Sequence, residues 1–363
     1  MTEPVYEKLV DALNARGGIM PAIKCKELFA LLEELFTPEE AEFAAKLPPS
    51  PIPAETFARE IAGDPKEVES LLETMANKGL VFSGERDGVR FYNLMALAVG
   101  IFEMQFMKGE VSDRARKLAR VFEDYANALQ KLAAAAPTGS AGFPTARVLT
   151  VEKEIPASTE IHPYDRVSEY IANSDYITVG ICYCRHHGEL LGRPCDKPKD
   201  VCMAFGPWAQ FIAGRGFGRL VSKEDALQVL DRAEKAGLIH CTTNIGKHLH
   251  FLCNCCVCHC PIIGSIKNAA IPSMVATSSF IASLEEGDCS GCGDCVELCQ
   301  MDALTMEGDI VVLDAERCIG CGVCVSVCPT GALRLEPREG APVPPFDGKE
   351  FNQAVRSSLQ QNR

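Results

Sequence analysis

The sequence has no excess of basic charge and no apolar run suited to a lipid bilayer. Its 36 Lys and Arg stand against 49 Asp and Glu, which gives a formal net charge of −13. Because nucleic acids attract positive protein surfaces, this balance argues against nucleic acid as a partner. The longest uncharged stretch of the cysteine-rich region, 248–266, holds cysteines and histidines that a membrane helix would not need. Residues 1–18 also lack the apolar run of a signal peptide, so we expect a cytoplasmic protein without a membrane span.

Cysteine is nearly absent from the first half of the chain. Only Cys25 precedes residue 182, and the rest of the 19 cysteines lie between Cys182 and Cys328. Disulfide scaffolds of such density are short secreted chains that cannot build a core. This chain has 363 residues, 47% of them hydrophobic, and is long enough for two or three cores. The distribution therefore indicates thiolates that bind metal in a reducing compartment.

Residues 1–135 are expected to form a mostly helical, winged-helix-like domain. Thr37 and Asp64 are each followed by Pro at the first helical position and by Glu at the third, which is typical of a helix start. A pair of helices followed by a hairpin is the pattern of a winged helix. The predicted elements are helices over 54–62 and 65–78, then strands near 80–82 and 89–92 around a turn running from Ser83-Gly84 to Asp87-Gly88.

The charge of this domain favours docking over DNA binding. Residues 1–137 carry 16 Lys and Arg against 22 Asp and Glu, and the would-be recognition helix is itself acidic. Contacts to DNA phosphates require the reverse balance.

A further helix is predicted over 112–134 and an interdomain linker over 136–149. Apolar residues recur along the helix at spacings of four and three, which fits either a core-facing helix or the seam of a homodimer. The residues of this stripe are Leu118, Phe122, Tyr125, Leu129 and Leu132. The small uncharged residues that follow, interrupted by Pro137 and Pro144, predict the linker.

Residues 284–340 contain the strongest motif of the chain, a repeated four-cysteine run. In the bacterial ferredoxin pattern, three closely spaced cysteines of a run hold one [4Fe–4S] cluster and the fourth ligates the other cluster. The spacing therefore predicts a ferredoxin-like domain with two clusters. The first would be held by Cys289, Cys292, Cys295 and Cys328, and the second by Cys299, Cys318, Cys321 and Cys324.

The residues between these ligands fit the same interpretation. Glycines at 291, 293, 320 and 322 are expected to adopt positive φ and to bring backbone N–H groups near the sulfurs. Two structural zinc sites are the alternative, although zinc does not require two matched runs. Gln300 stands where the first run would usually have Pro, and is expected to loosen the turn after Cys299. Residues 341–363 are expected to be a C-terminal tail.

Residues 150–280 are expected to form a cysteine-rich α+β domain, which makes the whole chain a multidomain α+β protein. A helix is predicted between Ser222 and Gly237, surrounded by short loop-rich segments. Core packing does not explain so many thiols, and neighbours on an extended segment face opposite sides. We therefore expect one or two further iron–sulfur clusters. Their ligands would come from Cys182, Cys184, Cys195, Cys202, Cys253, Cys255, Cys256, Cys258 and Cys260, with Cys241 just upstream of the last five.

Zinc is the alternative metal for this middle domain. The histidines that would suit a zinc site are His186, His187, His248, His250 and His259, although each alone fits a structural role. The run Gly214-Arg215-Gly216-Phe217-Gly218 is only a weak match to a phosphate-binding loop, and its Arg215 could equally stabilise cluster charge.

The whole chain resembles a group of iron–sulfur proteins from anaerobic microorganisms, with a ferredoxin-type 4Fe-4S dicluster segment. The similarity extends to the Val-Gly-Ile-Phe-Glu-Met-Gln-Phe-Met stretch at 99–107, the Cys-x-Cys-Arg start at Cys182, the spacing of Cys195 and Cys202, and the Cys-Asn-Cys-Cys signature at Cys253. His259 stands where these proteins often carry another cysteine. The resemblance implies electron transfer in anaerobic redox metabolism, a winged-helix-like start and a cysteine-rich middle domain.

Three functions are compatible with these features. The first is a soluble electron carrier, or an electron-transfer subunit of an oxidoreductase, that docks its acidic surface on a basic redox partner. The second is a metal-centred enzyme with an open iron site near Arg185, His186 and His187. The third is a redox-sensing regulator that uses the winged helix, which the negative charge opposes. The chain is thus expected to be an electron carrier or an oxidoreductase component rather than a stand-alone enzyme.

Overall fold

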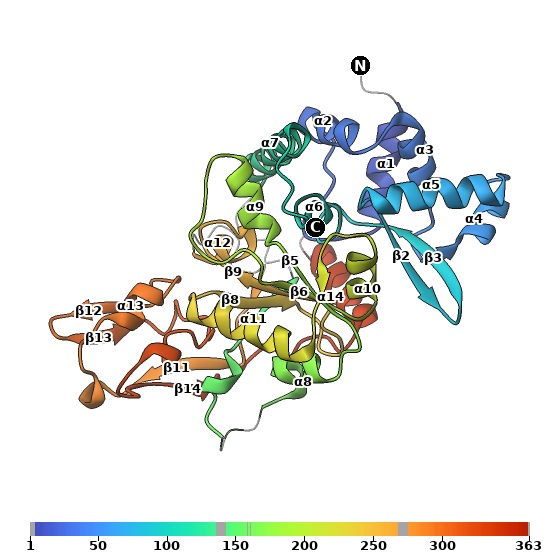
Figure 1. Cartoon of the computed structure of the whole chain (residues 1–363). Helices are drawn as coiled ribbons and strands as arrows, with labels where there is room; N and C mark the ends of the chain where they lie inside the picture. Colours follow the sequence, from blue (N-terminus) through green and yellow to red (C-terminus); the bar gives the residue numbers. More distant parts are fainter. Residues whose placement is uncertain (1–3, 136–142, 158, 160, 268–274, 362–363) are drawn as a thin grey trace. The chain divides into compact units, whose positions relative to one another are not determined.

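The computed structural model describes residues 4–135, 143–157, 159, 161–267 and 275–361, and it mixes helix and sheet (Figure 1). Contacts divide the chain into two compact units. The first comprises residues 1–138, 183–194 and 210–219, and the second comprises 139–182, 195–209 and 220–363. The predicted boundaries are therefore wrong in one respect: the cysteine-rich middle region and the ferredoxin-like segment form one unit, and two pieces of the middle region belong to the first.

The first unit is mostly helical, as predicted. Its helices are α1 (Pro4–Asn14), α2 (Lys26–Leu35), α3 (Pro38–Ala45), α4 (Ala54–Glu60), α5 (Pro65–Asn77), α6 (Ile101–Phe106), α7 (Asp113–Ala135) and α9 (Tyr183–Leu190). Its strands are β1 (Ile52–Pro53), β2 (Val81–Arg86) and β3 (Val89–Leu94), in the order β1-β3-β2. The helix starts at Thr37 and Asp64 are confirmed, because the Thr37 hydroxyl accepts from Glu40 N–H and Asp64 accepts from two backbone N–H groups of α5.

The hairpin of the first unit is longer than predicted. Strand β2 continues through Gly84 to Arg86, so the turn does not begin at Ser83-Gly84. Asp87 and Gly88 have φ values of 53° and 74°. Positive φ at both central positions is typical of a two-residue type I′ hairpin turn, so this pair closes the hairpin alone.

The apolar stripe of α7 faces the core over its first half. Leu118, Phe122 and Tyr125 are at most 2% exposed, and the Tyr125 hydroxyl accepts from Ile23 N–H at 2.8 Å. Leu132, by contrast, is 47% exposed. Burial against the unit's own helices therefore accounts for the first part of the stripe, and the homodimer seam stays a prediction.

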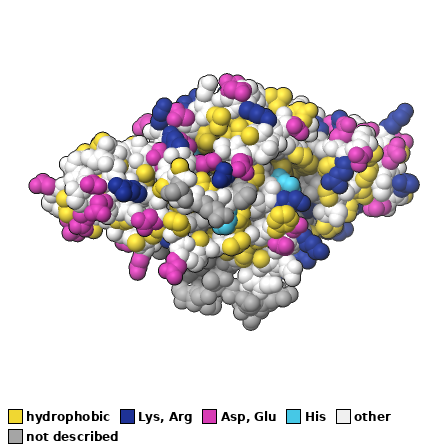
Figure 2. Space-filling view, turned by 90° about the horizontal axis from the view of Figure 1, so that it is seen from below, with side chains coloured by type: hydrophobic (Ala, Val, Ile, Leu, Met, Phe, Trp, Pro, Cys, Tyr) yellow, Lys and Arg dark blue, Asp and Glu magenta, His cyan; other side chains and the backbone are white. Residues whose placement is uncertain are grey.

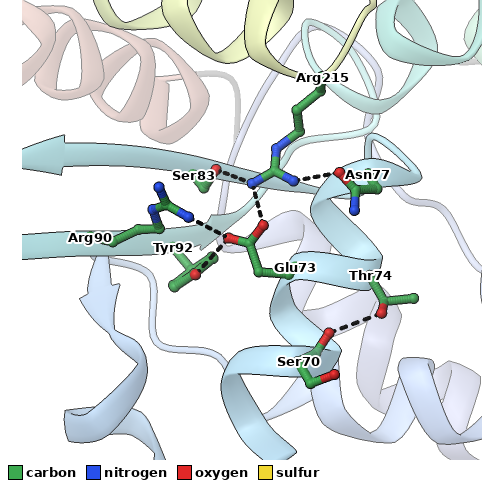
Figure 3. A network of polar contacts seen from close by, with 8 residues as sticks. All are labelled: Ser70, Glu73, Thr74, Asn77, Ser83, Arg90, Tyr92 and Arg215. Atoms are coloured by element: carbon green, nitrogen blue, oxygen red, sulfur yellow. Dashed lines mark hydrogen bonds and ion pairs between the residues drawn. The ribbon is translucent and has the colours of Figure 1, made fainter. Parts of the chain in front are cut away.

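Arg215 belongs to a polar network of the first unit (Figure 3). Its guanidinium donates to Glu73 at 3.0 Å, to the Ser83 hydroxyl at 2.6 Å and to the Asn77 side chain at 2.6 Å. The same carboxylate accepts from the Tyr92 hydroxyl at 2.7 Å. These contacts join α5 to the hairpin, so Arg215 has a structural role in this unit and the weak phosphate-loop interpretation is not supported.

The second unit is built on a seven-stranded sheet, where the sequence predicted loop-rich segments. The strand order is β10 (Val275–Ala276), β4 (Ala146–Leu149), β8 (Ile239–Thr243), β9 (Phe251–Cys255), β6 (Cys202–Phe205), β5 (Ile177–Gly180) and β7 (Arg219–Leu220). Its helices include α8 (Val167–Ala172), α11 (Lys223–Lys235), α12 (Pro261–Lys267) and α14 (Gly348–Gln361). Helix α10 (Gly206–Gly214) and strand β7 have residues in both units.

Strand β4 corrects the predicted linker. Residues 146–149 pair antiparallel with β8 and are all buried, so the linker predicted over 136–149 does not extend to its last four residues. The part over 136–142 lies outside the described residues. Likewise the predicted tail over 341–363 is partly ordered, because it contains α14 and the Gly246 N–H donates to Pro345 O at 2.8 Å.

The two faces of the sheet carry different cores. On one face Leu252 of β9 packs with residues of α8 and α11. On the other face Cys241 and Cys255 pack with Ile263 of α12 and with residues of the ferredoxin-like segment, including Met301. Alternation of side chains along a strand explains the separation. The cysteines of β8 and β9 are therefore turned toward the ferredoxin-like segment.

The ferredoxin-like segment contains two small antiparallel sheets and little helix. Strands β11 (Phe280–Leu284) and β14 (Leu333–Pro337) pair with each other, as do β12 (Leu304–Glu307) and β13 (Ile310–Leu313). Helix α13 (Asp294–Leu298) lies within the first cysteine run. In the part of the chain that the structure describes, no helix has the length and apolar character needed to cross a membrane.

Candidate metal centre

The ferredoxin-like segment encloses a first cavity lined by four cysteine thiols. Its volume, including the part open to solvent, is about 300 Å³. The cysteines that line it are Cys289, Cys292, Cys295 and Cys328. Among them Cys295 of α13 is buried and Cys292 is exposed. This is the set that the spacing predicted for the first cluster.

A second, larger cavity is lined by the other four cysteines. It has a volume of about 460 Å³ and apolar walls that include Ile239 of β8 and Leu313 of β13. The cysteines are Cys299, Cys318, Cys321 and Cys324. Burial raises the pKa of Cys321 to about 12. Thiolates remain charged in such a place only when a cation neutralises them, which a bound metal does.

The fourth cysteine of each run lies in the cavity of the other run. Each of these two sulfurs also accepts a backbone N–H from the residues that follow: Cys299 from Ala303 at 3.3 Å, and Cys328 from Leu333 at 3.5 Å. Such N–H···S bonds stabilise negative charge on sulfur and tune the potential of an attached cluster. The two cavities are thus equivalent in construction.

Glycine is required at one position of each cysteine run. Gly291 and Gly320 have φ values of 69° and 71°, as predicted from the sequence. A Cβ on Gly291 would lie 2.2 Å from Asp309 O, and one on Gly320 would lie 1.9 Å from Phe280 O. Because a side chain would displace these backbones, the loops can wrap the cavities only with glycine at both places.

The middle cysteines form groups around strand β9. The Cys202 thiol hydrogen-bonds to the thiols of Cys182 and Cys253, and these bonds, followed by burial, raise the pKa of Cys202 well above its usual value. Cys255 has the thiols of Cys241, Cys253 and Cys260 as partners. Cys253 therefore links two groups that together contain Cys182, Cys202, Cys241, Cys253, Cys255 and Cys260.

The sequence did not place Cys241 in the predicted ligand set. Its sulfur meets this set because β8 pairs with β9 in a register that puts Cys241 opposite Cys253. The residues around Cys241 do not indicate which strand β8 pairs with. Only the register of the sheet therefore reveals that Cys241 lies opposite Cys253. Cys184, which was predicted to join the middle ligands, lies on α9 in the first unit.

A third group lies at the turn that follows β9. The ligand atoms of Cys195, Cys256, Cys258 and His259 all lie within 4.8 Å of one another. Cys256 is buried, Cys258 is exposed, and the other two are half-buried. Three thiols and one imidazole are a donor set that a single metal ion can use.

Asn254 and Gln300 hold the cysteine strand in place. The Asn254 amide, which is fully buried, donates to Val201 O at 2.5 Å, and its oxygen lies 2.6 Å from His240 Nδ1. Gln300 Nε2 donates to Gly237 O at 2.5 Å, and its Oε1 accepts from Val257 N–H at 2.7 Å. The expectation that Gln300 loosens its turn is therefore wrong, because its amide joins the ferredoxin-like segment to the end of β9.

The remaining histidines have structural partners or lie apart from these groups. His186 and His187 on α9 bond through Nε2 to the carbonyl oxygens of Glu110 and Ala119, at 2.9 and 3.0 Å. Burial lowers the pKa of His250, which lies beside His248. Among the described residues, only His259 of the five predicted histidines lies in a tight group of metal-ligand atoms.

A family model described as a 4Fe-4S dicluster domain matches residues 288–332. The matched segment contains all eight cysteines that line the two cavities, from Cys289 to Cys328. No curated protein and no solved structure matches the chain. The match supports [4Fe–4S] clusters and iron–sulfur electron transfer for this segment, while the likeness of the remaining chain to proteins of anaerobes stays a prediction.

Replacing Gln300 with Met should destabilise the second unit by about 1–3 kcal/mol. Methionine has a similar length but leaves the Val257 N–H and the Gly237 carbonyl without their hydrogen-bond partner. Leaving buried polar groups unpaired usually costs about 1–3 kcal/mol. Denaturant unfolding of the full chain with its metals bound would measure the change. Gln228→Met, at an exposed position of α11, is the matched control; equal stability of both variants would contradict the role assigned to Gln300.

Proposed function

We propose that the chain is an iron–sulfur electron carrier, or an electron-transfer subunit of an oxidoreductase. The observation that supports this most is the pair of cavities, each lined by four cysteines and each receiving one cysteine from the other run. Cys289, Cys292, Cys295 and Cys328 would hold one [4Fe–4S] cluster, and Cys299, Cys318, Cys321 and Cys324 would hold the second. Clusters bound by four thiolates have no iron left open for a substrate and change only their charge.

The middle thiols would extend this path by at least one further cluster. Cys241, Cys255 and Cys260 share an apolar core with Cys299, Cys318 and Cys321 of the second cavity. The amide of Gln300 connects the same two segments. A cluster held by four of the six thiols around β9 would therefore lie next to the second ferredoxin-type cluster, which suits electron relay.

The surface of the ferredoxin-like segment suits a basic partner. Residues 284–340 carry twelve Asp and Glu against three Lys and Arg. Figure 2 shows acidic side chains gathered at the left end, where β12 and β13 lie in Figure 1. Asp288, Asp294 and Glu297 are exposed beside the cysteines of the first cavity. Complementary charge would steer a redox protein to this cavity, whose Cys292 is exposed.

The first unit would serve as a docking scaffold with a winged-helix-like part. The order α3, β1, α4, α5, β2, β3 and the antiparallel sheet β1-β3-β2 support this interpretation. Helix α5 exposes Glu67 and Glu69, which disfavours contact with DNA phosphates. His186 and His187, on which the enzyme hypothesis relies, are bonded to backbone carbonyls, so that alternative gains no support.

Replacing Cys295 or Cys324 with Ser should each remove or convert one of the two clusters. Each variant should lose between one and about four irons per chain and part of the reduced-state EPR signal, because one iron loses its thiolate. Cys25→Ser is the control, since Cys25 lies at the start of α2 in the first unit, and it should keep all iron. Full iron content and unchanged spectra in either cavity variant would contradict the ligand assignment.

Electron transfer to a basic protein should slow as salt is added. Exposed charges are screened over about 10 Å at 0.1 M ionic strength, so steering by the acidic surface is lost. Stopped-flow oxidation of the reduced protein by a basic acceptor such as cytochrome c would measure the rate. The double variant Asp294→Asn, Glu297→Gln should be slower at low salt, whereas Asp124→Asn on α7 should not. A rate independent of salt and of these variants would contradict docking at this surface.

A further inference from the structure

The tight group at the end of β9 has the dimensions of a site for one metal ion. The sulfurs of Cys195 and Cys258 are 3.8 Å apart. Two thiolates bound to one zinc at about 2.3 Å in a tetrahedron lie about 3.8 Å apart, which is the same separation. His259 Nδ1 lies 3.1 Å from the Cys258 sulfur and 4.0 Å from the Cys256 sulfur. A sulfur and a nitrogen bound to the same tetrahedral zinc ion lie about 3.6 Å apart, which is between these two distances.

A cubane cluster does not fit this spacing. Each of its thiolates binds a different iron and points outward from a different corner, so the sulfurs are further apart than on one tetrahedral ion. The eight cysteines of the two ferredoxin-type cavities are all described, and no group of three of them is as compact as the group with His259. The compact group therefore differs in kind from those cavities.

The environment of the group also fits a closed structural site. Cys256 belongs to the core that the sheet forms with α8 and α11, and Cys195 packs against the same core. Cys258 is exposed. The turn itself is fixed, because Cys260 N–H donates to Cys256 O at 3.0 Å and the Val257 N–H is held by Gln300. A metal here would tie the turn between β9 and α12 to the segment at Cys195, more than sixty residues away in the sequence.

We propose that Cys195, Cys256, Cys258 and His259 bind one zinc ion, separately from the iron–sulfur clusters. Three thiols lose their protons on binding and His259 contributes neutral Nδ1, so the site carries a net charge of −1 and exchanges no electron. Four protein ligands leave no position for substrate, which is the pattern of structural zinc. This places His259 among the ligands and removes Cys195, Cys256 and Cys258 from the candidates for a middle iron–sulfur cluster.

The test is a count of zinc and iron on the full chain, purified without oxygen and washed with a mild chelator. The wild type should hold about one zinc per chain, and Cys258→Ser should lower it at least tenfold without loss of iron. Cys292→Ser, in the first ferredoxin-type cavity, should lower the iron content and leave the zinc content unchanged. His259→Cys should keep the zinc on four thiolates, which tests the ligand set even if the serine variant folds poorly.

Cobalt provides a second readout of the same ligands. Cobalt(II) in place of zinc should give the absorption bands of a tetrahedral thiolate site, and these bands should shift in His259→Cys as nitrogen is replaced by sulfur. Three results would overturn the proposal: less than about 0.2 zinc per wild-type chain, zinc that survives Cys258→Ser, or a loss of about four irons in that variant. Because zinc and iron are counted separately, failure here leaves the two ferredoxin-type clusters untouched.

Discussion

The neutralisation of buried thiolates by metal is the constraint on which the second unit depends. Its cysteines all lie among the described residues and are free thiols there, and most of them are buried or half-buried within apolar cores. A buried thiolate is stable only beside a positive charge, and a bound metal both supplies that charge and accounts for several thiols lying together. The iron–sulfur clusters that we propose for the two cavities would do both. Metal binding would then contribute directly to folding, because the sites do not exist in the unfolded chain.

The sheet explains how one short segment serves several centres. Strand β9 alternates its side chains, so Cys253 and Cys255 face the ferredoxin-like segment while Leu252 faces the opposite core. The chain then turns at Cys256, whose thiol joins that opposite core. Asn254 fixes the strand between its neighbours, and Gln300 fixes its end to the ferredoxin-like segment. A run of five cysteines in eight residues is thereby divided among separate groups of neighbouring thiols.

Local patterns in the sequence were sufficient for the parts whose geometry is local. The caps at Thr37 and Asp64 and the helix that begins after Ser222 follow from short spacings and are found where the sequence predicts them. The two sets of four ferredoxin-type cysteines also follow from short spacings, and each set lines one cavity. The seven-stranded sheet was missed because its strands are short and come from distant segments. β4 in particular follows small residues and prolines that indicate a linker. Cys241 and Gln300 act through strand register and long-range amide bonds, which no local pattern encodes.

The most direct test of the account is the amount of iron and acid-labile sulfide per chain, measured on protein purified without oxygen from iron-replete cells. Two filled ferredoxin-type cavities predict about eight irons with an equal amount of sulfide, and a cluster at β9 would bring the total to about twelve. A colourless protein with fewer than about two irons and no sulfide would contradict the central claim that the two cysteine-lined cavities hold [4Fe–4S] clusters.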